Sequence, residues 1–539
     1  MIYPQNFETK IGFDEIRDLL KQRCLSTLGK GKVDDMAFSS DADEIKEWIE
    51  QTREFRHIQD GADDFPLQYF FDVRDAIKRI RLENTHLEES ELFDLRRSLQ
   101  TINDIVRYLN RAEDKGEDVD PAPLYPALYR LTQDVATYPQ LVQGIDQILD
   151  KFGHIRDNAS PELLNIRREL ARAESSVSKT LYSILRSAQS EGLVDKDVTP
   201  TLRDGRLVIP VMPGMKRKIS GIVHDESATG KTVFIEPSEV VEANNRIREL
   251  ESEERHEIIR ILTTFTNKVR PHSRDILESY SFLATIDFIR AKAELAKLTK
   301  AIEPEITDKP HVDWIQSRHP LLQLSLEKQG KKVVPLDIIL NKDKHILIIS
   351  GPNAGGKSVC LKTVGLLQYM VQCGLSIPVG DRSTVGIFDN VMIDIGDEQS
   401  LENDLSTYSS HLLNMKNMMR QANNKTIILI DEFGTGTEPQ IGGAIAEAVL
   451  EQFCNKGAWG GITTHYQNLK HFADSHEGVA NGAMLYDRHE MRALFQLAIG
   501  RPGSSFAIEI ARKTGLPEEV IQKASEIVGS DYIQSDKYL

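Results

Sequence analysis

The sequence predicts a multidomain protein whose first part is mainly α-helical and whose last part is an α/β domain. Before about residue 300, long helical patterns are interrupted by one stretch of short β-prone runs. From about residue 312, short apolar runs alternate with helical segments, which is typical of parallel strands buried on both faces. We therefore expect an N-terminal helical core over 1–150, a long-helix lever over 151–300 and an α/β domain over 301–539. The length of 539 residues is typical of about three or four domains.

The composition excludes several classes of protein. Hydrophobic residues make up 40% and charged residues 27% of the chain, as in ordinary soluble globular proteins. Because 82 acidic residues exceed 66 basic ones, the net charge of −16 argues against coating nucleic acid by bulk charge, though not against a local basic groove. No apolar run reaches the ~18 residues that a membrane span needs, so no membrane partner is expected. The four cysteines form no C-x-x-C pair and the first residues show no signal-peptide pattern, which indicates a cytoplasmic protein without a cysteine zinc site.

Two long helices are expected in the first part of the chain, after helical stretches broken most clearly by a charged loop at 114–121. The first begins with Ser160 as N-cap and Pro161 as its first residue. Its apolar face repeats about every seven residues and consists of Leu163, Leu170, Val177, Leu181, Ile184 and Ala188. The second begins near Ser238, and its apolar face consists of Val241, Ile247, Leu250, Ile258, Leu262, Phe265 and Val269.

A β-rich unit is predicted between these helices, at about 196–236. Its β-prone runs, punctuated by glycines, are 207–211, 219–223 and 232–235. Two long helices with such a unit at their far end would form a lever with a tip. Periodicity does not separate this arrangement from a small β unit packed on a helical bundle. The basic run Lys216–Lys218 lies in this unit, and it is either a solvated loop or a contact for nucleic-acid phosphates.

A phosphate-binding loop is the strongest motif in the sequence. Residues 351–358 fit G-x-x-x-x-G-K-[ST] between the predicted strand at 346–349 and a helix starting near Val359. The glycines let backbone N–H groups converge on phosphate oxygens, and the helix N-terminus adds its positive end. Lys357 is expected to reach the β- and γ-phosphates of ATP, and Ser358 to ligate Mg²⁺. The alternative is a glycine-rich turn that binds nothing. The predicted nucleotide-binding residues are Gly351, Pro352, Asn353, Ala354, Gly355, Gly356, Lys357 and Ser358.

Polar residues at the ends of two later strands complete the predicted site. The apolar run 427–430 ends in Asp431 and Glu432, at the edge where α/β sheets place their ligands. Asp431 is expected to hold Mg²⁺ through water, and Glu432 to polarise the attacking water. His465 follows the apolar run at 461–464, where it could hydrogen-bond the γ-phosphate. Alone, the carboxylates would more often form a solvated strand end and the histidine would more often be structural.

Taken together, these motifs resemble those of the MutS family of ATPases in their usual order. The resemblance rests on the phosphate loop followed by Ser406-Thr407-Tyr408, Asp431–Thr437 and Thr464-His465-Tyr466. Residues 515–521 resemble the family's helical segment that packs against the partner subunit. Four further stretches resemble the type-two MutS branch: 203–206, 221–225, 234–237 and 396–400. The resemblance as a whole covers nearly the whole chain.

The resemblance implies an ABC-type P-loop ATPase that forms a homodimer and opens and closes a clamp with its nucleotide state. Within the family, the serine equivalent to Ser406 caps the γ-phosphate of the other protomer, and Tyr408 here replaces the usual Phe. Two targets are implied: branched DNA, in suppression of homologous recombination, or stalled and collided ribosomes, in rescue. Because the helical core starts almost at residue 1, we expect no mismatch-reading domain. Because the chain stops at Leu539, we expect a truncated chain without the Smr nuclease domain.

Two alternatives remain open. A transporter-like or SMC-like ATPase head would carry a Leu-Ser-Gly-Gly-Gln signature, which the sequence lacks. A non-catalytic scaffold that dimerises and binds ATP without turnover would not need Lys357, Asp431 and Glu432, and all three are present. Measurement of phosphate release separates the scaffold from the ATPase.

Overall fold

Contacts divide the chain into two compact units. The computed structural model describes residues 1–67, 71–204, 206–352, 356–396, 404–500, 502–504 and 506–529. The first unit, here the sheet unit, comprises 1–67, 108–133 and 282–539, and the second, the lever unit, comprises 68–107 and 134–281. The predicted boundaries at 150 and 300 do not coincide with this division, because the chain leaves the sheet unit and returns to it twice. The three-segment division therefore stays a prediction.

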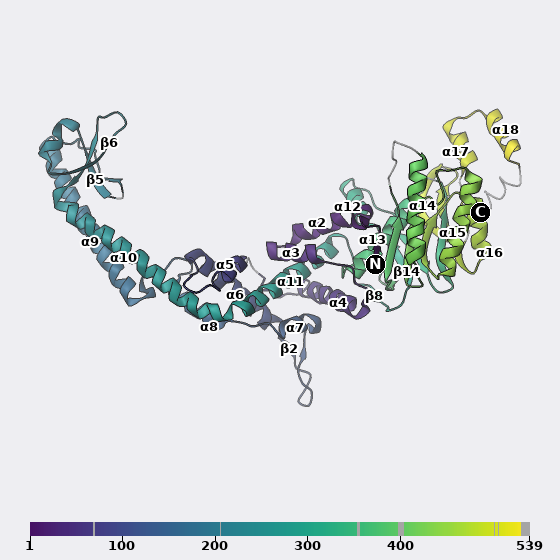
Figure 1. The fold of residues 1–539 in the computed structure, drawn as a ribbon, viewed down its shortest axis with the longest axis horizontal. Helices are drawn as coiled ribbons and strands as arrows, with labels where there is room; N and C mark the ends of the chain where they lie inside the picture. Colours follow the sequence, from purple (N-terminus) through teal and green to yellow (C-terminus); the bar gives the residue numbers. More distant parts are fainter. Residues whose placement is uncertain are drawn as a thin grey trace. The chain divides into compact units, whose positions relative to one another are not determined.

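A seven-stranded sheet forms the centre of the sheet unit within the described residues (Figure 1). Its strands are parallel except for the last pair, and their order is β1 (Ile2–Tyr3), β13 (Asn390–Asp394), β14 (Thr426–Ile430), β15 (Trp459–Thr463), β11 (Lys344–Ser350), β16 (Gly478–Asp487) and β17 (Arg492–Ile499). The four apolar runs predicted as strands are β11, β13, β14 and β15. All residues of β14 and β15 are buried, as continuous apolar runs predict.

Helices cover both faces of this sheet. Alternate residues such as Leu347 and Leu429 face α13 (Lys357–Gln372), together with α1 (Phe7–Ile11) and α2 (Phe13–Arg23). Residues between them, such as Ile348 and Ile428, face the other helical layer. That layer consists of α14 (Asp404–Gln421), α15 (Pro439–Asn455) and α16 (Gln467–Ser475). The N-terminal helices thus share one core with the phosphate-loop helix.

Smaller elements complete the sheet unit. A four-stranded sheet within the described residues has the order β10 (Leu336–Leu340), β9 (Val312–Ser317), β12 (Thr384–Val385) and β8 (Glu305–Ile306). The remaining helices are α3 (Thr27–Asp35), α4 (Ala42–Gln59), α7 (Pro126–Thr132), α11 (Ser273–Leu298) from Phe282 onward, α12 (Pro320–Lys328), α17 (Ala507–Thr514) and α18 (Glu518–Val528). The loop predicted at 114–121 lies between the paired strands β2 (Ala112–Glu113) and β3 (Ala122–Pro123).

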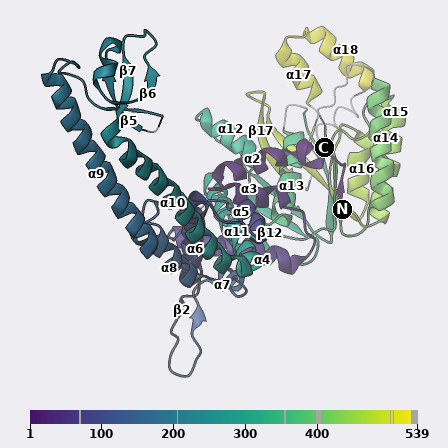
Figure 2. The same ribbon diagram turned by 60° about the vertical axis from the view of Figure 1, so that its left-hand side comes forward.

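Two long helices, α9 (Pro161–Ser190) and α10 (Ser238–Val269), lie side by side in the lever unit (Figure 2). Both start where the sequence predicts. The Ser160 hydroxyl accepts a hydrogen bond from the Leu163 amide at 3.0 Å, which makes it the N-cap of α9. The buried stripes differ from a strict heptad, because an α-helix has 3.6 residues per turn. Leu185 is more buried than Ile184, and Val240 more than Val241. Shorter helices accompany the pair: α5 (Arg74–Arg79), most of α6 (Glu89–Leu109) and α8 (Pro139–Ile148).

The β-rich unit predicted between the two helices is an antiparallel sheet, here called the tip. Within the described residues its order is β4 (Thr201–Arg203), β5 (Arg206–Val211), β7 (Val233–Pro237) and β6 (Gly221–Glu226). Its apolar side chains share one core with the end of α9 and the start of α10. The basic run lies in a 3₁₀ helix, η2 (Pro213–Lys218), where the sequence suggests a loop.

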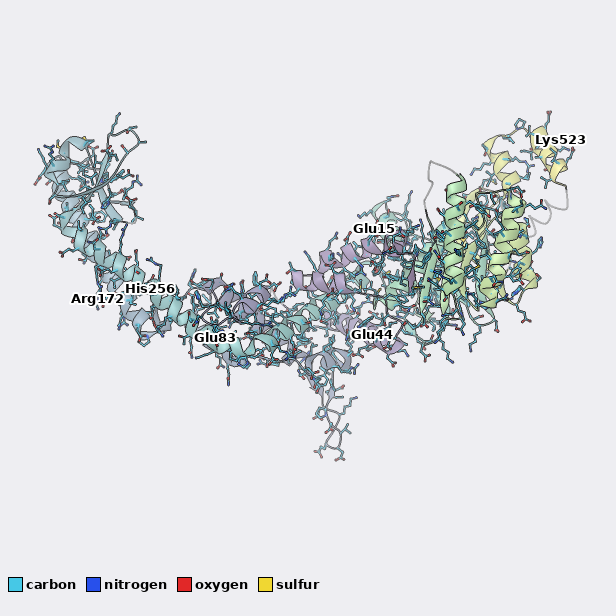
Figure 3. All side chains as sticks on the ribbon, viewed as in Figure 1. Glu15, Glu44, Glu83, Arg172, His256 and Lys523 are labelled. Atoms are coloured by element: carbon cyan, nitrogen blue, oxygen red, sulfur yellow. The ribbon has the colours of Figure 1, made fainter. Side chains whose placement is uncertain are left out.

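The six residues labelled in Figure 3 are all exposed: Glu15, Glu44, Glu83, Arg172, His256 and Lys523. Of these, Arg172 lies on α9 and His256 on α10. In the described part of the chain, no helix combines the length and the apolar character that crossing a bilayer requires.

Candidate active site

The phosphate-loop motif lies at the carboxyl end of β11 and the start of α13. Gly351 and Pro352 follow the strand, Gly356 is the N-cap of the helix and Lys357 is its first residue. Gly356 has a φ of +90°, and a Cβ there would lie 2.9 Å from Phe495 Cδ1. Glycine is therefore required at this position both by the backbone and by its neighbour. The predicted residues Asn353, Ala354 and Gly355 lie outside the described residues.

One threonine positions both predicted carboxylates beside this loop. Asp431 follows β14, and its Oδ2 accepts a hydrogen bond from the Ser358 hydroxyl at 2.6 Å. The Thr463 hydroxyl donates to Asp431 Oδ1 at 2.6 Å and accepts from the Glu432 amide at 2.8 Å. Glu432 has a φ of +49°, a conformation uncommon for a residue with a side chain. Thr463, at the end of β15, thus fixes the turn that carries Asp431 and Glu432.

Lys357 and His465 meet at the same edge of the sheet. Lys357 is 3% exposed, and its Nζ lies 3.3 Å from Nε2 and 3.4 Å from Nδ1 of His465. Burial lowers the pKa of Lys357 to about 8, and the nearby Glu432 and Asp431 charges counter part of that effect. Burial, followed by the charge of Lys357, lowers the pKa of His465 to about 4. His465 is therefore a neutral imidazole at pH 7, able to accept or to donate one hydrogen bond.

Further polar residues support the site, and sequence reasoning missed them. The Asp431 amide donates to the Asp394 carbonyl oxygen at 3.0 Å. The Asp394 carboxylate lies 2.6 Å from His411 Nδ1 and accepts from the Asn414 amide at 3.2 Å. Asp394 ends β13, the neighbour of β14. Its place at the carboxyl end of a predicted strand was the one feature of the sequence that could have indicated a role in the site. No local spacing connects it to His411 or to Asn414.

The structure brings five predicted residues together: Lys357, Ser358, Asp431, Glu432 and His465. It leaves the predicted role of Ser406 untested, because the side chain of this α14 residue lies outside what the structure describes. Residues 397–400 also lie outside the described residues. Tyr408, two positions after Ser406, has a buried hydroxyl without a hydrogen-bond partner among the described residues.

Two cavities adjoin the phosphate loop. One has a volume of about 520 Å³ and is lined by Gly356, Val359, Met484 and Phe495, among others. The second, of about 1270 Å³, is lined by Pro352, His465, Tyr486 and Phe495 together with residues of α17. Both exceed the lower limit of about 300 Å³ that is usual for small-molecule sites. The loop is therefore bordered by enough space for a nucleoside triphosphate.

The residues present fit a magnesium ion better than a metal held by the protein alone. In the described residues, no three His, Cys, Asp or Glu side chains cluster as a metal site would require. Mg²⁺ is usually held by one or two protein oxygens, with water and substrate phosphates completing its shell. Ser358 Oγ and Asp431 Oδ2, 2.6 Å apart, supply such a pair.

Comparisons with known proteins give the chain its family. The model of MutS domain V matches residues 347–530, which contain all five of the assembled site residues. The chain is 38% identical over 519 residues to Endonuclease MutS2 of Geobacillus sp. (strain WCH70), covering 96% of this chain and 64% of that protein. It is 36% identical over 527 residues to Endonuclease MutS2 of Enterococcus faecalis, covering 98% and 65%. The chain belongs to the type-two branch of the MutS family. It spans slightly less than two thirds of the length of these MutS2 relatives.

Proposed function

We propose that this MutS2-type chain is an ATPase that hydrolyses ATP to ADP and phosphate. The arrangement of Lys357, Ser358 and Asp431 at the phosphate loop carries the proposal. A hydroxyl and a carboxylate lie in contact beside a nearly buried lysine, at the carboxyl edge of a parallel sheet. In phosphoryl transfer, catalysis comes mainly from positioning and from electrostatic stabilisation.

Each residue has a distinct task in the proposed reaction. Lys357 and the backbone of the loop bind the phosphates, and a bound polyanion returns Lys357 to its charged form. His465, neutral and next to Lys357, donates a ring N–H to a γ-phosphate oxygen. Glu432 accepts a hydrogen bond from the attacking water and orients it in line with the γ-phosphorus. Mg²⁺ held by Ser358 and Asp431 would neutralise charge on the phosphate oxygens.

Phosphate release from Mg–ATP tests this proposal. We expect steady turnover by the chain and a fall to background in Lys357→Met, which keeps the length of the side chain but removes its charge. Lys342→Met is the matched control, because Lys342 is exposed in the turn before β11, away from the loop. Normal turnover in Lys357→Met would contradict the assignment. No turnover in the unaltered chain, with ATP still bound, would favour the non-catalytic scaffold.

The same proposal includes a homodimer formed through the ATPase part. Large apolar side chains are exposed on α14, α15, α17 and α18 and between the last two helices, as at surfaces that bind another protein: Leu412, Leu413, Ile441, Ile510, Leu516, Val520, Ile527 and Val528. In such a dimer Ser406 acts on the nucleotide of the partner. A heterodimer of Ser406→Ala and Lys357→Met would then have one doubly altered site and one intact site.

Mixing the two variants tests this arrangement. Activity above that of either variant alone supports action in trans. Confirmed heterodimers without restored activity would contradict it.

The tip is the proposed clamp on nucleic acid or on a ribosome. Arg217 and Lys218 are exposed in η2, beside Lys216. The proposed clamp does not use a mismatch-reading domain. DNA binding should then follow backbone charge and shape rather than mispaired bases. Gel shifts on a perfect duplex, a single mismatch and a four-way junction test this. Preference for the mismatch over the perfect duplex would contradict it.

Replacing the three basic residues should weaken binding, with each lost phosphate contact reducing the salt slope by about 0.7–0.9. Unchanged affinity for all three DNAs would direct attention to a ribosomal target. A pull-down with ATP, followed by identification of bound RNA and proteins, would then identify it. The endonuclease name belongs to the relatives, and no nuclease residue is proposed here.

A further inference from the structure

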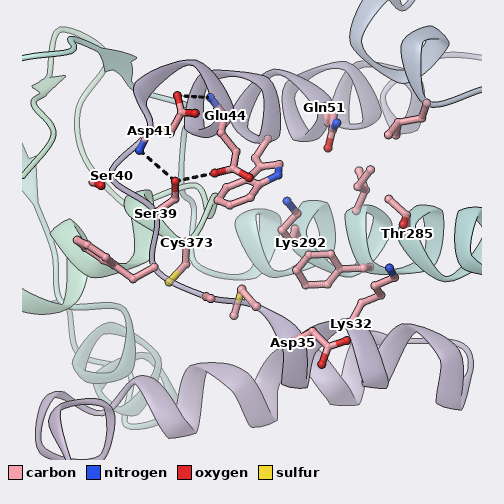
Figure 4. A pocket seen from close by; sticks show the side chains of 17 residues that line it. Lys32, Asp35, Ser39, Ser40, Asp41, Glu44, Gln51, Thr285, Lys292 and Cys373 are labelled. Carbon is pink, nitrogen blue, oxygen red and sulfur yellow. Dashed lines mark hydrogen bonds between the residues drawn. The ribbon is translucent and has the colours of Figure 1, made fainter. Parts of the chain in front are cut away.

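A second cavity in the sheet unit lies away from the phosphate loop. It has a volume of about 680 Å³ and is lined by residues of α3, 36–41, α4 and α11, together with Leu131 and Cys373 (Figure 4). This volume is within the range of about 300–1,000 Å³ that is usual for small-molecule sites. Its lining includes none of the residues of the candidate active site.

The walls of this cavity are apolar, whereas its rim is polar. The apolar lining consists of Met36, Phe38, Trp48, Leu131, Phe288 and Ile289. At the rim, the Ser39 hydroxyl donates to Glu44 Oε2 at 2.7 Å. Asp41 Oδ1 accepts from the amides of Asp43 and Glu44 and so caps α4. The rim acceptors are thus engaged with one another and with the start of the helix.

One buried cation projects into the cavity. Lys292 of α11 is 3% exposed, and its amine points across the cavity toward α4 (Figure 4). Its one hydrogen bond to a described residue is a long one, 3.4 Å to the Gly374 carbonyl oxygen. The amine also lies 4.8 Å from the centre of the Phe288 ring. A lysine amine carries up to three donors, so most of its capacity is unused by the described residues.

The charges around Lys292 do not neutralise it. Lys32 and Asp35 from α3, Asp41 and Glu44 from the start of α4, and Cys373 line the same cavity. Among the described residues, none of these carboxylates forms an ion pair with Lys292. Burial lowers the pKa of Lys292 to about 7. Burial also raises the pKa of the Cys373 thiol, so this group stays neutral beside the amine. A buried amine of this kind gains most from an anionic acceptor.

We infer that this cavity binds a small aromatic carboxylate, with the carboxylate at Lys292 and the ring against Trp48 and Phe288. Apolar walls bury an aromatic ring, and the one buried lysine of the lining matches a single negative charge. Three carboxylates at the rim repel molecules that carry several negative charges, so a nucleotide is disfavoured. This site is independent of the proposed ATPase activity.

Titration of the full chain with 2-naphthoate, followed by tryptophan fluorescence and calorimetry, tests the inference. We expect one saturable site whose affinity falls at least tenfold in Lys292→Met. Lys297→Met, at an exposed position of the same helix, should bind as the unaltered chain does. The neutral 2-naphthamide should bind equally to all three proteins. ATP should not compete.

The pH dependence provides a readout that needs no variant. A carboxylate prefers the protonated amine, so naphthoate affinity should fall as the pH rises from 7 to 9, and binding at pH 8 should take up protons. Calorimetry in two buffers of different ionisation enthalpy measures this uptake. Absence of binding, equal affinity in Lys292→Met, or binding without proton uptake would each overturn the inference.

Discussion

Two clusters of buried charged residues in this protein differ in whether the buried charge has an oppositely charged hydrogen-bond partner within the protein. In the tip, the fully buried Glu236 accepts from Arg206 at 2.7 Å and lies 2.5 Å from His224 Nε2. At the phosphate loop, the nearly buried Lys357 has a neutral imidazole as its close partner, and no carboxylate among the described residues forms an ion pair with it. In the first cluster, the buried carboxylate is paired with side chains of the same sheet, so the cluster stabilises the fold. The second leaves a buried lysine without a direct ion pair among the described residues, which favours binding of an anion.

Glu432→Gln is expected to produce the largest effect and tests whether the second cluster is catalytic. The amide keeps the shape of the side chain but cannot activate water, so turnover should fall about 10³-fold. ATP should still bind, and the ATP-bound dimer should accumulate in light scattering. Glu477→Gln, exposed at the opposite end of β16, is the control. An unchanged hydrolysis rate would place the catalytic group elsewhere.

Glu236→Ala tests whether the first cluster is purely structural. Removing the carboxylate leaves Arg206 and His224 without their buried partner, so the free energy of unfolding should fall by about 3–5 kcal/mol. Urea unfolding measures this loss, and basal ATP hydrolysis should stay unchanged. Glu242→Ala, exposed on α10, should cost little. A loss of hydrolysis by the folded variant would contradict the division between the two clusters.

The pH dependence of stability sharpens the comparison further. In the unfolded chain Lys357 has a pKa near 10.5, against about 8 in the folded chain without nucleotide. Between these values the unfolded state binds more protons, so stability should rise with pH, by up to about 2–3 kcal/mol. Urea unfolding at pH 8, 9 and 10, compared with Lys357→Met, isolates this contribution. A difference between the two proteins that does not change with pH would show that Lys357 is not buried as described.

The smallest expected effect concerns Thr463, whose hydroxyl contacts the Asp431 carboxylate and the Glu432 backbone amide. Thr463→Val keeps the shape but removes the hydroxyl that donates to Asp431 and accepts from Glu432. Turnover should fall about 10–100-fold, mainly in kcat, because the carboxylates lose their alignment rather than their charge. Thr426→Val, at the opposite end of β14, makes a similar polar-to-apolar change away from the site. Equal effects of the two substitutions would mean that Thr463 contributes only to stability.

The sequence predicted elements whose signals are local. Ser160 and Pro161 mark the start of α9 because capping depends on neighbouring residues. The phosphate loop and the strand ending at Asp431 were predictable for the same reason. The comparisons confirm the family that these motifs indicate.

Features that depend on residues distant in sequence could not be predicted. The support that Asp394 gives to Asp431 depends on the pairing of β13 with β14, which no spacing encodes. Residues 1–67 pack with the C-terminal half through apolar surfaces. Periodicity in the sequence identifies each apolar surface, but it does not show which surface packs against which. Burial of Lys292 has the same origin. Helical spacing alone would have placed a lysine in solvent.

The pairing of β1 with β13 has a consequence for folding during synthesis. Ile2 pairs with Val391, and Tyr3 with Met392, so the first strand leaves the ribosome long before its partner exists. The side chains of α1 and α2 that pack against α13 likewise lack their partner until α13 has been synthesised. The stretch from residue 68 to residue 281, by contrast, contains the whole of the lever unit, so all of that unit has been synthesised by residue 281. Nascent chains released at about residue 300 should therefore contain a protease-resistant fragment from this stretch and a cleavable N-terminal segment. Limited proteolysis of such chains would detect this order.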